Sequence, residues 1–435
     1  MEKKSLTVTG TGDALFVARF PDYYKTQKEE ITKFINGHDL KITNLETNLS
    51  DFGKYANAYS GGTWINTPKE YFSDLKGMGF NFYGTANNHC MDYGHKGLVS
   101  TIECLDAHGV AHAGTGVDLQ SAQKPAVLDL NGKKVAVIAV DASFEKASKA
   151  GNPTCNFEGR PGVNYLRHST SYPINKEQEK VLRQISEQTG INYNRDFNIA
   201  TGYVNPDPEG VYVFGGITFT TREGEPVTKC NQVDKERILS IIKQSKTEND
   251  YVFMQIHCHD DDNRSHAHAP EYLEEFCRAS IEAGVSAVFG GGCHELRGIE
   301  IYKGKPIFYS LGDFIYQGPQ VEKLPADFME QFNAPLNLTA EQALNVRSRG
   351  GKVGLHLNKE NYLTVLPSLT FDGEELKEIK LLPVGLNFDK KDKLNGLPAV
   401  AQGEEAKEIL NVLNKLSSKY NLKFKIQESF IVLDK

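Results

Sequence analysis

The sequence predicts an α/β protein, because short apolar segments typical of buried strands alternate along the chain with segments of helical periodicity. The 435 residues, 39% of them hydrophobic and 24% charged, are enough for a sizeable core and have an ordinary globular composition. Polar residues of the types that bind metals follow several of the apolar segments directly. Because ligands of open α/β sheets bind beyond the carboxyl ends of the strands, this pattern favours a site along one sheet edge.

The predicted strands are short runs rich in apolar or β-branched residues. They cover residues 6–10, 41–45, 80–84, 134–140, 251–256, 286–289 and 306–310. The predicted helices have apolar residues at helical spacing and cover residues 28–35, 69–78, 95–108, 235–245 and 271–283. Pro68 and Pro270 precede two of these helices, and proline is favoured at a helix start.

The composition changes between about residues 142 and 233, where Gly, Pro, Asn, Tyr and charged residues become frequent. Only residues 177–188 look helical there, and an insertion of this length is usually a lid or a substrate-facing segment, or else disordered. A polar stretch at 317–345 follows Asp313, and the remaining predicted elements come after it. These are strands near 353–357, 363–369 and 376–382, a helix at 404–420 and a strand at 423–432. We therefore predict one domain over 1–390, containing the 142–233 insertion, and a C-terminal helix–strand appendage over 391–435.

Charge and cysteine usage exclude several classes of protein. A net charge of −7 provides no electrostatic footprint for nucleic acid or an anionic membrane. The seven cysteines are irregularly spaced and form no CxxC pair, which argues against a zinc ribbon or a disulfide framework. No segment approaches the ~20 apolar residues of a membrane span. Reduced cysteines favour a cytoplasmic location, unless an N-terminal signal or anchor has been removed.

The residues that follow the predicted strands form a coherent set of metal ligands. They are Asp13, Glu46, Asn88 with His89, His257, and His294. If the strands share a sheet edge, these loops meet in one crevice. Carboxylate, amide and imidazole ligands suit Mn, Zn or Fe, and a carboxylate such as Glu46 can bridge two ions. Two ions ~3.5–4 Å apart can generate hydroxide and stabilise an oxyanion.

Several motifs resemble the CapA family of capsule or poly-γ-glutamate synthesis proteins, in a branch without a signal peptide. They are Asn44–Thr47, Ser60–Thr63, Ala86–His89 with Asp92–Gly94, Gly159–Asn164 and Gly298–Phe314. The resemblance extends from about Gly12 to Phe314, and the long run from Ile299 to Phe314 is its most specific part. It implies a metallophosphoesterase-like (calcineurin-like) fold, which is a four-layer sandwich of mixed β-sheets flanked by helices, with the site at one edge.

The resemblance also implies a role for each residue of the set. Asp13 and His294 would bind one metal, Glu46 would bridge, and Asn88 and His257 would hold the second. His89 would not be a ligand. It would protonate the leaving group or stabilise the oxyanion, oriented by Asp92 in the way that carboxylates near metal sites commonly act.

Position 291 departs from the family pattern. The family usually has Gly-His-Gly-Pro-His where this chain has Gly290–His294, so Gly291 takes the place of an expected ligand. His259, Asp260 and Cys293 are the candidates to replace that ligand, and a site with one metal is the alternative. Asp313 stands where the family usually has Asn. His266 and His268 lie in a polar loop, and we interpret them as solvated.

The predicted activity is hydrolysis of a phosphoester or a γ-glutamyl bond by metal-bound hydroxide. Arg160, Arg167 and Arg297 are candidates to bind an anionic small molecule or polymer, because guanidinium binds such groups in a bidentate way. The alternative, motivated by Gly291, is a non-catalytic module with a degenerate metal site that binds an acidic polymer or a protein partner.

Overall fold

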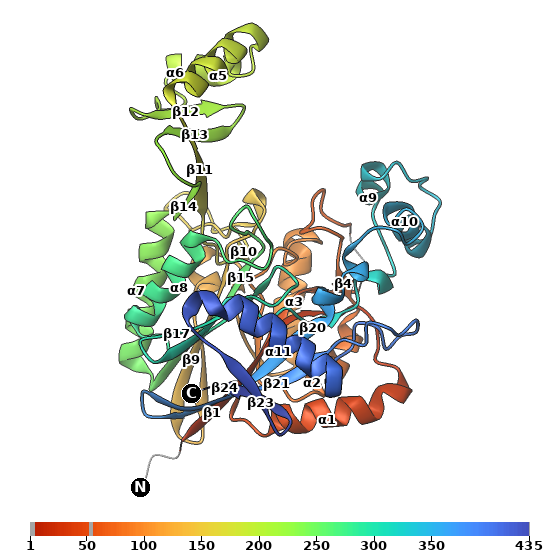
Figure 1. The fold of residues 1–435 in the computed structure, drawn as a ribbon. Helices are drawn as coiled ribbons and strands as arrows, with labels where there is room; N and C mark the ends of the chain where they lie inside the picture. The colour runs from red at the N-terminus through yellow and green to blue at the C-terminus, as the bar shows by residue number, and fades with distance from the viewer. Residues whose placement is uncertain (1–4, 52–54, 435) are drawn as a thin grey trace.

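Two mixed β-sheets form the centre of the protein, and helices lie on their outer sides (Figure 1). The computed structural model describes residues 5–51 and 55–434. The larger sheet has ten strands in the order β23-β24-β21-β20-β1-β2-β5-β6, with β19 paired to β1 and β22 paired to β21. Its strands are β1 (Leu6–Leu15), β2 (Leu40–Leu45), β5 (Phe82–Gly84), β6 (Ala111–Ala113), β19 (Asp313–Tyr316), β20 (Leu363–Asp372), β21 (Glu375–Gly385), β22 (Ala399–Val400), β23 (Phe424–Gln427) and β24 (Phe430–Leu433).

The second sheet has six strands in the order β17-β18-β16-β15-β9-β8. Its strands are β8 (Ala126–Leu130), β9 (Lys133–Asp141), β15 (Tyr251–Cys258), β16 (Ala287–Gly292), β17 (Ile299–Tyr302) and β18 (Lys305–Phe308). The central strands β9, β15, β16 and β18 run parallel, whereas β8 and β17 pair antiparallel at the edges. In the larger sheet, β1 pairs in parallel with β2 and β19 and antiparallel with β20. The mixed α/β class expected from the sequence is therefore confirmed.

The remaining elements are helices and short pairs of strands. The helices are α1 (Lys25–Asn36), α2 (Phe72–Lys76), α3 (Gly94–Ala107), α4 (Leu119–Ala122), α5 (Lys176–Thr189), α6 (Tyr193–Ala200), α7 (Gln232–Glu248), α8 (Glu271–Ala283), α9 (Ala326–Gln331), α10 (Ala340–Arg347) and α11 (Gly403–Ser417). The short strands are β3 (Asn48–Leu49), β4 (Asn66–Thr67), β7 (Thr115–Gly116), β10 (Gly162–Val163), β11 (His168–Ile174), β12 (Val211–Phe214), β13 (Ile217–Thr221) and β14 (Val227–Cys230).

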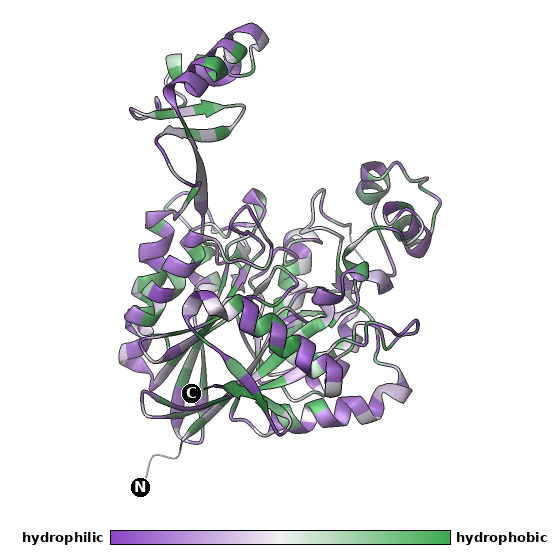
Figure 2. Ribbon diagram, in the orientation of Figure 1, coloured by the Kyte–Doolittle hydropathy of each residue, from purple (hydrophilic) through white to green (hydrophobic). Residues whose placement is uncertain are grey.

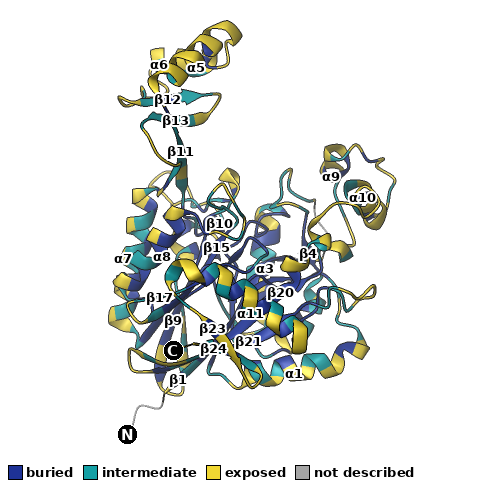
Figure 3. Cartoon of the chain, in the orientation of Figure 1, coloured by how far each residue is buried: buried dark blue, intermediate teal, exposed yellow. Residues whose placement is uncertain are grey.

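The two sheets pack face to face through a shared apolar core. Strand β15 is buried along its whole length, so both of its faces carry large apolar side chains. Tyr251 and Phe253 point into the core between the sheets, while Met254 and Ile256 point to the outer face under α7 and α8. The outer face of the larger sheet packs on α1 and α2. Figure 2 shows hydrophobic residues concentrated in the strands, and Figure 3 shows the same strands buried.

The C-terminal segment is part of the larger sheet. Strand β24 pairs with β21, and Ile409 and Leu413 of α11 belong to the core between the sheets. The predicted strand at 423–432 is instead a hairpin of β23 and β24, because Glu428 adopts a positive φ of 56° that turns the chain. The predicted strand near 353–357 is wrong. Residues 355–357 form a short 3-10 helix, and the positive φ angles of Gly350, Gly351 and Gly354 are incompatible with an extended strand.

The predicted insertion contains a projecting module, here called the arm, which comprises residues 168–230. The arm holds strands β11 to β14, which form their own sheet, together with α5 and α6. The helix predicted at 177–188 is present as α5, whereas α6 and the four strands were not predicted. Figure 1 shows the arm extending away from the two main sheets, and Figure 3 shows that its helices are mostly exposed.

All seven cysteines are free thiols, in agreement with the expected absence of a disulfide framework. Among the described residues, none of the helices has the length and apolar composition that crossing a bilayer requires.

Replacement of Phe289 by alanine is expected to lower the free energy of unfolding by about 3–5 kcal/mol, because it leaves a cavity between the two sheets. The Phe289 side chain is fully buried on β16, and its ring centroid lies 5.7 Å from that of Phe308. Phe157→Ala is the matched control, since Phe157 is 78% exposed and its removal should change stability by less than about 0.5 kcal/mol. Urea unfolding followed by circular dichroism would measure both, and equal midpoints for the two variants would contradict the proposed core.

Candidate metal centre

Polar side chains from both sheets meet at the edge where their parallel strands end. Asp13 lies in β1 and Glu46 directly follows β2, both in the larger sheet. His257 lies near the end of β15 in the second sheet, in register with Gly291 of β16. Because parallel strands of each sheet end on the same side, residues far apart in the sequence become neighbours here.

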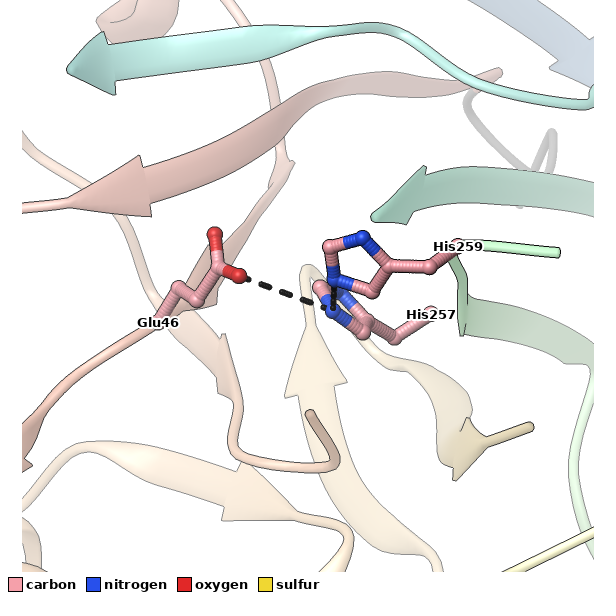
Figure 4. A group of neighbouring side chains, drawn as sticks. All are labelled: Glu46, His257 and His259. Atoms are coloured by element: carbon pink, nitrogen blue, oxygen red, sulfur yellow. Dashed lines mark hydrogen bonds and ion pairs between the residues drawn. The ribbon is translucent and has the colours of Figure 1, made fainter. Parts of the chain in front are cut away.

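Glu46 is the central residue of this cluster. Its side chain is fully buried, and neither carboxylate oxygen accepts a hydrogen bond from any described residue. The nearest partners are imidazoles, with Oε1 lying 3.5 Å from His257 Nε2 and 4.0 Å from His89 Nε2. Figure 4 shows the Glu46 carboxylate facing the rings of His257 and His259. A buried carboxylate without donors requires an explanation, and a bound cation would provide one.

One ligand group consists of Asp13, Glu46, His294 and Asp313, whose ligand atoms all lie within 4.8 Å of one another. His294 Nδ1 lies 2.8 Å from Asp313 Oδ1, and Asp313 Oδ2 is buried without a hydrogen-bond partner among the described residues. Asp313 therefore orients His294 through one oxygen and leaves the other free to act as a ligand. His294 adopts a φ of 61°, a strained conformation that is typical of functional positions.

Backbone geometry places Asp13 beside Asp313. Strands β1 and β19 pair in parallel with Asp13 opposite Asp313, and a register shift between Asp13 and Ala14 changes the direction of the side chains. This approach requires glycine at position 12, because a Cβ there would lie 1.7 Å from the carbonyl oxygen of Gly312. The Asp13 carboxylate is then fixed by two donors, the Asn44 side chain at 2.6 Å and the Gly292 amide at 2.6 Å.

The second ligand group surrounds His257 Nε2. Asn88 Oδ1 lies 2.8 Å, His259 Nε2 3.2 Å and Glu46 Oε1 3.5 Å from that nitrogen. These separations are close to the ~3.4 Å expected between tetrahedral ligands that each lie ~2.1 Å from an ion. The Asn88 amide donates its Nδ2 hydrogen to the Gly61 carbonyl at 2.8 Å, which leaves the amide oxygen directed at the group. Glu46 belongs to both groups, as a bridging ligand would.

Position 291 cannot hold a side chain in this arrangement. A Cβ on Gly291 would lie 2.4 Å from Asp13 Oδ1, so any larger residue would displace the carboxylate. The imidazole that the family pattern places at 291 has a counterpart in His259, which lies two residues after His257 and joins the second ligand group. Of the three replacement candidates named from the sequence, His259 is therefore the one that the structure brings to the centre.

The other two candidates have protein partners of their own. Asp260 Oδ2 accepts hydrogen bonds from Tyr272 at 2.8 Å and Ser143 at 3.1 Å, and it pairs with His168 at 3.2 Å. The Cys293 thiol is buried and donates to the Glu295 carbonyl at 3.2 Å. Neither residue belongs to the two ligand groups.

The ionisation of the cluster reflects its excess of carboxylates. Burial and the neighbouring Asp13 carboxylate raise the pKa of Glu46 to about 7. Burial also raises the pKa of Asp313 to about 6, although His294 opposes the rise. Burial alone would lower the pKa of His257, but Asp13 and Glu46 outweigh it and raise that pKa to about 9. When no metal ion is bound, the negative charge of the carboxylates therefore favours the protonated form of the neighbouring imidazoles.

His89 is held at the rim of the centre by Asp92. Its Nδ1 lies 2.6 Å from Asp92 Oδ2, so its Nε2 is the atom that faces Glu46. Asp92 is fixed in turn by the backbone amides of Gly61 at 3.0 Å and Ile65 at 2.8 Å. Burial opposes protonation of His89, but the Asp92 carboxylate outweighs it and raises the pKa of the imidazole. A protonated Nε2 directed at the centre is the arrangement required of a general acid.

A cavity of about 1230 Å³ opens over the centre, with His89, His259 and His294 in its wall. None of the three arginines named from the sequence lines it. Arg160 is exposed and donates to the Lys149 carbonyl, and Arg167 forms a bidentate pair with Asp234. Arg297 is fully buried and donates to backbone carbonyls, including that of Asp260 at 2.7 Å, so it stabilises the loop after β15. A substrate-binding role for Arg160 and Arg167 stays a prediction.

Two acidic residues of this region were not predicted from the sequence as part of the site. Asp313 was noted only as a departure from the family pattern, yet it contacts His294. Asp141 ends β9 opposite His257, is fully buried and has one oxygen without a hydrogen-bond partner among the described residues. Burial raises the pKa of Asp141 to about 6. A signal was available for both, because each carboxylate adjoins an apolar run, as the predicted ligands do.

Comparisons with known proteins give a consistent family relationship. The sequence model described as "Bacterial capsule synthesis protein PGA_cap" matches residues 7–318. Two proteins of Sinorhizobium fredii, y4sH and y4uA, are each 30% identical over 433 residues, covering 97% of this chain and 91% of theirs. The capsule biosynthesis protein CapA of Bacillus anthracis is 22% identical over 323 residues, covering 72% of this chain and 61% of that protein. A solved structure from Thermus thermophilus, at 12% identity, covers 86% of this chain and 97% of its own with a TM-score of 0.39.

Replacement of Glu46 by glutamine is expected to weaken the binding of Mn²⁺ or Zn²⁺ at both ligand groups by at least ~100-fold, because one carboxylate serves both. Without metal, the variant should unfold at the same temperature as the wild type or higher, since a buried charge without donors has been removed. Titration calorimetry and thermal unfolding measure the two effects. Glu341→Gln is the control, because Glu341 lines the same cavity but is exposed and outside both groups. Unchanged metal affinity in Glu46→Gln would contradict the shared-ligand arrangement.

Restoring the family's histidine through Gly291→His is expected to reduce metal binding, because its Cβ would displace the Asp13 carboxylate. His259→Ala should lower the bound metal from two ions per chain towards one. Elemental analysis after dialysis against Mn²⁺ would measure both variants. A gain of metal in Gly291→His, or full occupancy in His259→Ala, would show that the second ligand group is wrongly assigned.

Proposed function

Because the chain belongs to the PGA_cap family of bacterial capsule synthesis proteins, we propose that it is a metal-dependent hydrolase of capsule or poly-γ-glutamate metabolism. The single observation that carries the catalytic part is the Glu46 carboxylate, which is buried between two groups of metal-type ligands and has no hydrogen-bond donor in the described part of the chain. Stable folding alone would favour a paired or apolar residue at this position. A bound cation that takes part in catalysis would explain why an unpaired carboxylate lies next to an open cavity.

The proposed fold assignment is the metallophosphoesterase-like, calcineurin-like four-layer sandwich. Two face-to-face mixed sheets with helices on both outer faces support it. The position of the ligands, at the carboxyl ends of strands from both sheets, supports it as well.

The donor set fits two divalent ions of the Mn, Zn or Fe type. Asp13, Glu46, His294 and Asp313 would hold one ion, and Glu46, Asn88, His257 and His259 would hold the other. Such ions supply an activated water near neutral pH and positive charge that stabilises an oxyanion. The protein contributes fixed ligand positions, because Asn44, the Gly292 amide and the Gly61 carbonyl hold the side chains of Asp13 and Asn88 in place.

His89 and Asp92 would handle the proton of the leaving group. Asp92 holds the imidazole through Nδ1, so Nε2 can donate its proton to the departing oxygen or nitrogen. The Asp92 carboxylate also raises the pKa of this imidazole, which favours its protonated form. A phosphoester and a γ-glutamyl amide both develop negative charge on oxygen and release a group that needs a proton. These two bond types are therefore the proposed substrates.

The non-catalytic alternative was motivated by the missing ligand at 291. His259 supplies an imidazole to the second ligand group, and Asp92 directs His89 Nε2 towards Glu46. Both observations favour hydrolysis over passive binding of an acidic polymer.

Hydrolysis would be tested with p-nitrophenyl phosphate, bis(p-nitrophenyl) phosphate and γ-glutamyl-p-nitroanilide, each with Mn²⁺ or Zn²⁺. Wild-type protein is expected to turn over at least one of them, and chelation should abolish the activity. His89→Asn should lower kcat by about 10²–10⁴-fold without changing metal content, because His89 acts as an acid and not as a ligand.

The control variant is His95→Asn, which removes an exposed imidazole six positions along the chain, outside both ligand groups. Its kcat should equal that of the wild type. Absence of turnover on all three compounds with either metal bound would favour the binding module instead.

A further inference from the structure

The cavity over the metal centre has an outer wall that lies beyond the family match. This wall is the lobe, defined here as residues 326–357, which contains α9 and α10. The sequence model of the family ends at residue 318, so the lobe is not part of the matched region. Figure 1 shows the lobe as a projection at the upper right, separate from the arm. The inner wall of the cavity thus contains the candidate metal ligands, and the lobe forms its outer wall, where it can contact a substrate.

Arg347 is the cation that the lobe presents to this cavity. It is the last residue of α10, and its guanidinium donates a hydrogen bond to the Thr63 hydroxyl on the facing loop. Arg347 and Thr63 line the cavity together with His89, His259 and His294. Within the described part of the chain, no carboxylate forms an ion pair with Arg347. One hydrogen bond uses only one of the five N–H donors of a guanidinium.

A second observation places Arg347 near the centre. Tyr316 of β19 lines the same cavity as Arg347. The Tyr316 ring centroid lies 6.4 Å from that of His294, a proposed metal ligand. Arg347 therefore shares the cavity with a proposed ligand and with the tyrosine beside it.

The rest of the lobe's wall mixes apolar and uncharged polar side chains. Phe332, Leu338, Leu344, Val353 and Leu355 line it. Glu341 is the acidic residue of this wall, and it is exposed. Arg347 is itself partly buried in this wall. A partly buried guanidinium attracts an anion more strongly than one on an open surface, since less water screens the interaction. Such a position suits a carboxylate or a phosphate.

We propose that Arg347 binds an anionic group of the substrate that is separate from the bond cleaved at the metal centre. This inference rests on the proposed hydrolase function and narrows its substrates to compounds with a carboxylate or phosphate set apart from the scissile bond. Arg347 is then a specificity-determining residue. The competing role is structural, in which Arg347 only braces the lobe against Thr63.

Matched substrates that differ in one charge distinguish the two roles. The amide pair is γ-glutamyl-p-nitroanilide and its analogue with the α-carboxylate converted to a carboxamide. Each member of the phosphodiester set has a p-nitrophenyl group on one side of the phosphate. The other side carries glycolate, glycolamide or phosphoglycol. Its two charged members separate recognition of a carboxylate from recognition of a phosphate.

Arg347→Gln is expected to lower kcat/KM for the charged substrates by about 10- to 100-fold and to leave the neutral analogues unchanged, because a charge-assisted contact is lost. Arg347→Lys should retain part of the preference, since it keeps the charge but not the bidentate geometry. Arg349→Gln is the control, because Arg349 is exposed two residues further on and does not line the cavity. Equal losses for charged and neutral substrates, or the same losses in Thr63→Ala, would establish bracing and overturn the proposal.

Binding without turnover gives an independent readout. The chain has one tryptophan, Trp64, which follows Thr63 and packs on Phe328 and Met329 of the lobe. Titration of the metal-loaded protein with glutarate should change its fluorescence in a saturable way, and Arg347→Gln should weaken that binding about tenfold or more. If no substrate is hydrolysed, the hydrolase proposal fails while this titration still decides the role of Arg347. Equal glutarate binding by the wild type and Arg347→Gln would overturn it.

Discussion

The main constraint on this structure is the burial of several carboxylates at one edge of the two sheets, where their negative charges repel one another. Asp13, Glu46 and Asp313 are fully buried there, and Glu46 has no hydrogen-bond donor among the described residues. Removing such charges from water is costly unless cations compensate them. Imidazoles can provide that compensation by retaining protons, and divalent ions can provide it by replacing those protons. The close approach at Gly12, the register shift after it and the positive φ of His294 all serve to hold this charge cluster together.

Much of the central fold could be predicted because its signals are local. Strands such as β9 and β15 are apolar runs that must be buried on both faces, and α8 begins at a proline with a regular apolar face. The same local pattern located Asp13, Glu46 and His257, since each lies where an apolar run stops. The elements that were missed have weaker signals. The strands of the arm contain polar residues and pair only with each other, and glycine geometry at 350–354 prevents the strand expected near 353–357.

The parts of the site that could not be predicted depend on contacts between distant segments. Asp313 joins the first ligand group only because β19 pairs in parallel with β1, about 300 residues earlier in the chain. His259 lies in the second ligand group because the chain after β15 turns its ring back towards His257. From the sequence alone, position 291 looked like a missing metal ligand. In three dimensions it is a position where glycine is required, because the Asp13 carboxylate occupies the space of a side chain. The sequence alone likewise does not indicate that the candidate ligands and Arg347 of the lobe line one cavity.

The most direct measurement of the central claim is a crystal structure of the protein grown with Mn²⁺, with anomalous scattering used to locate the ions. The account predicts two Mn²⁺ ions ~3.5–4 Å apart, with one Glu46 oxygen or both shared between them and His259 bound to the ion that also contacts His257. An anomalous map without a peak beside Glu46, or with ions only at exposed acidic residues, would contradict it.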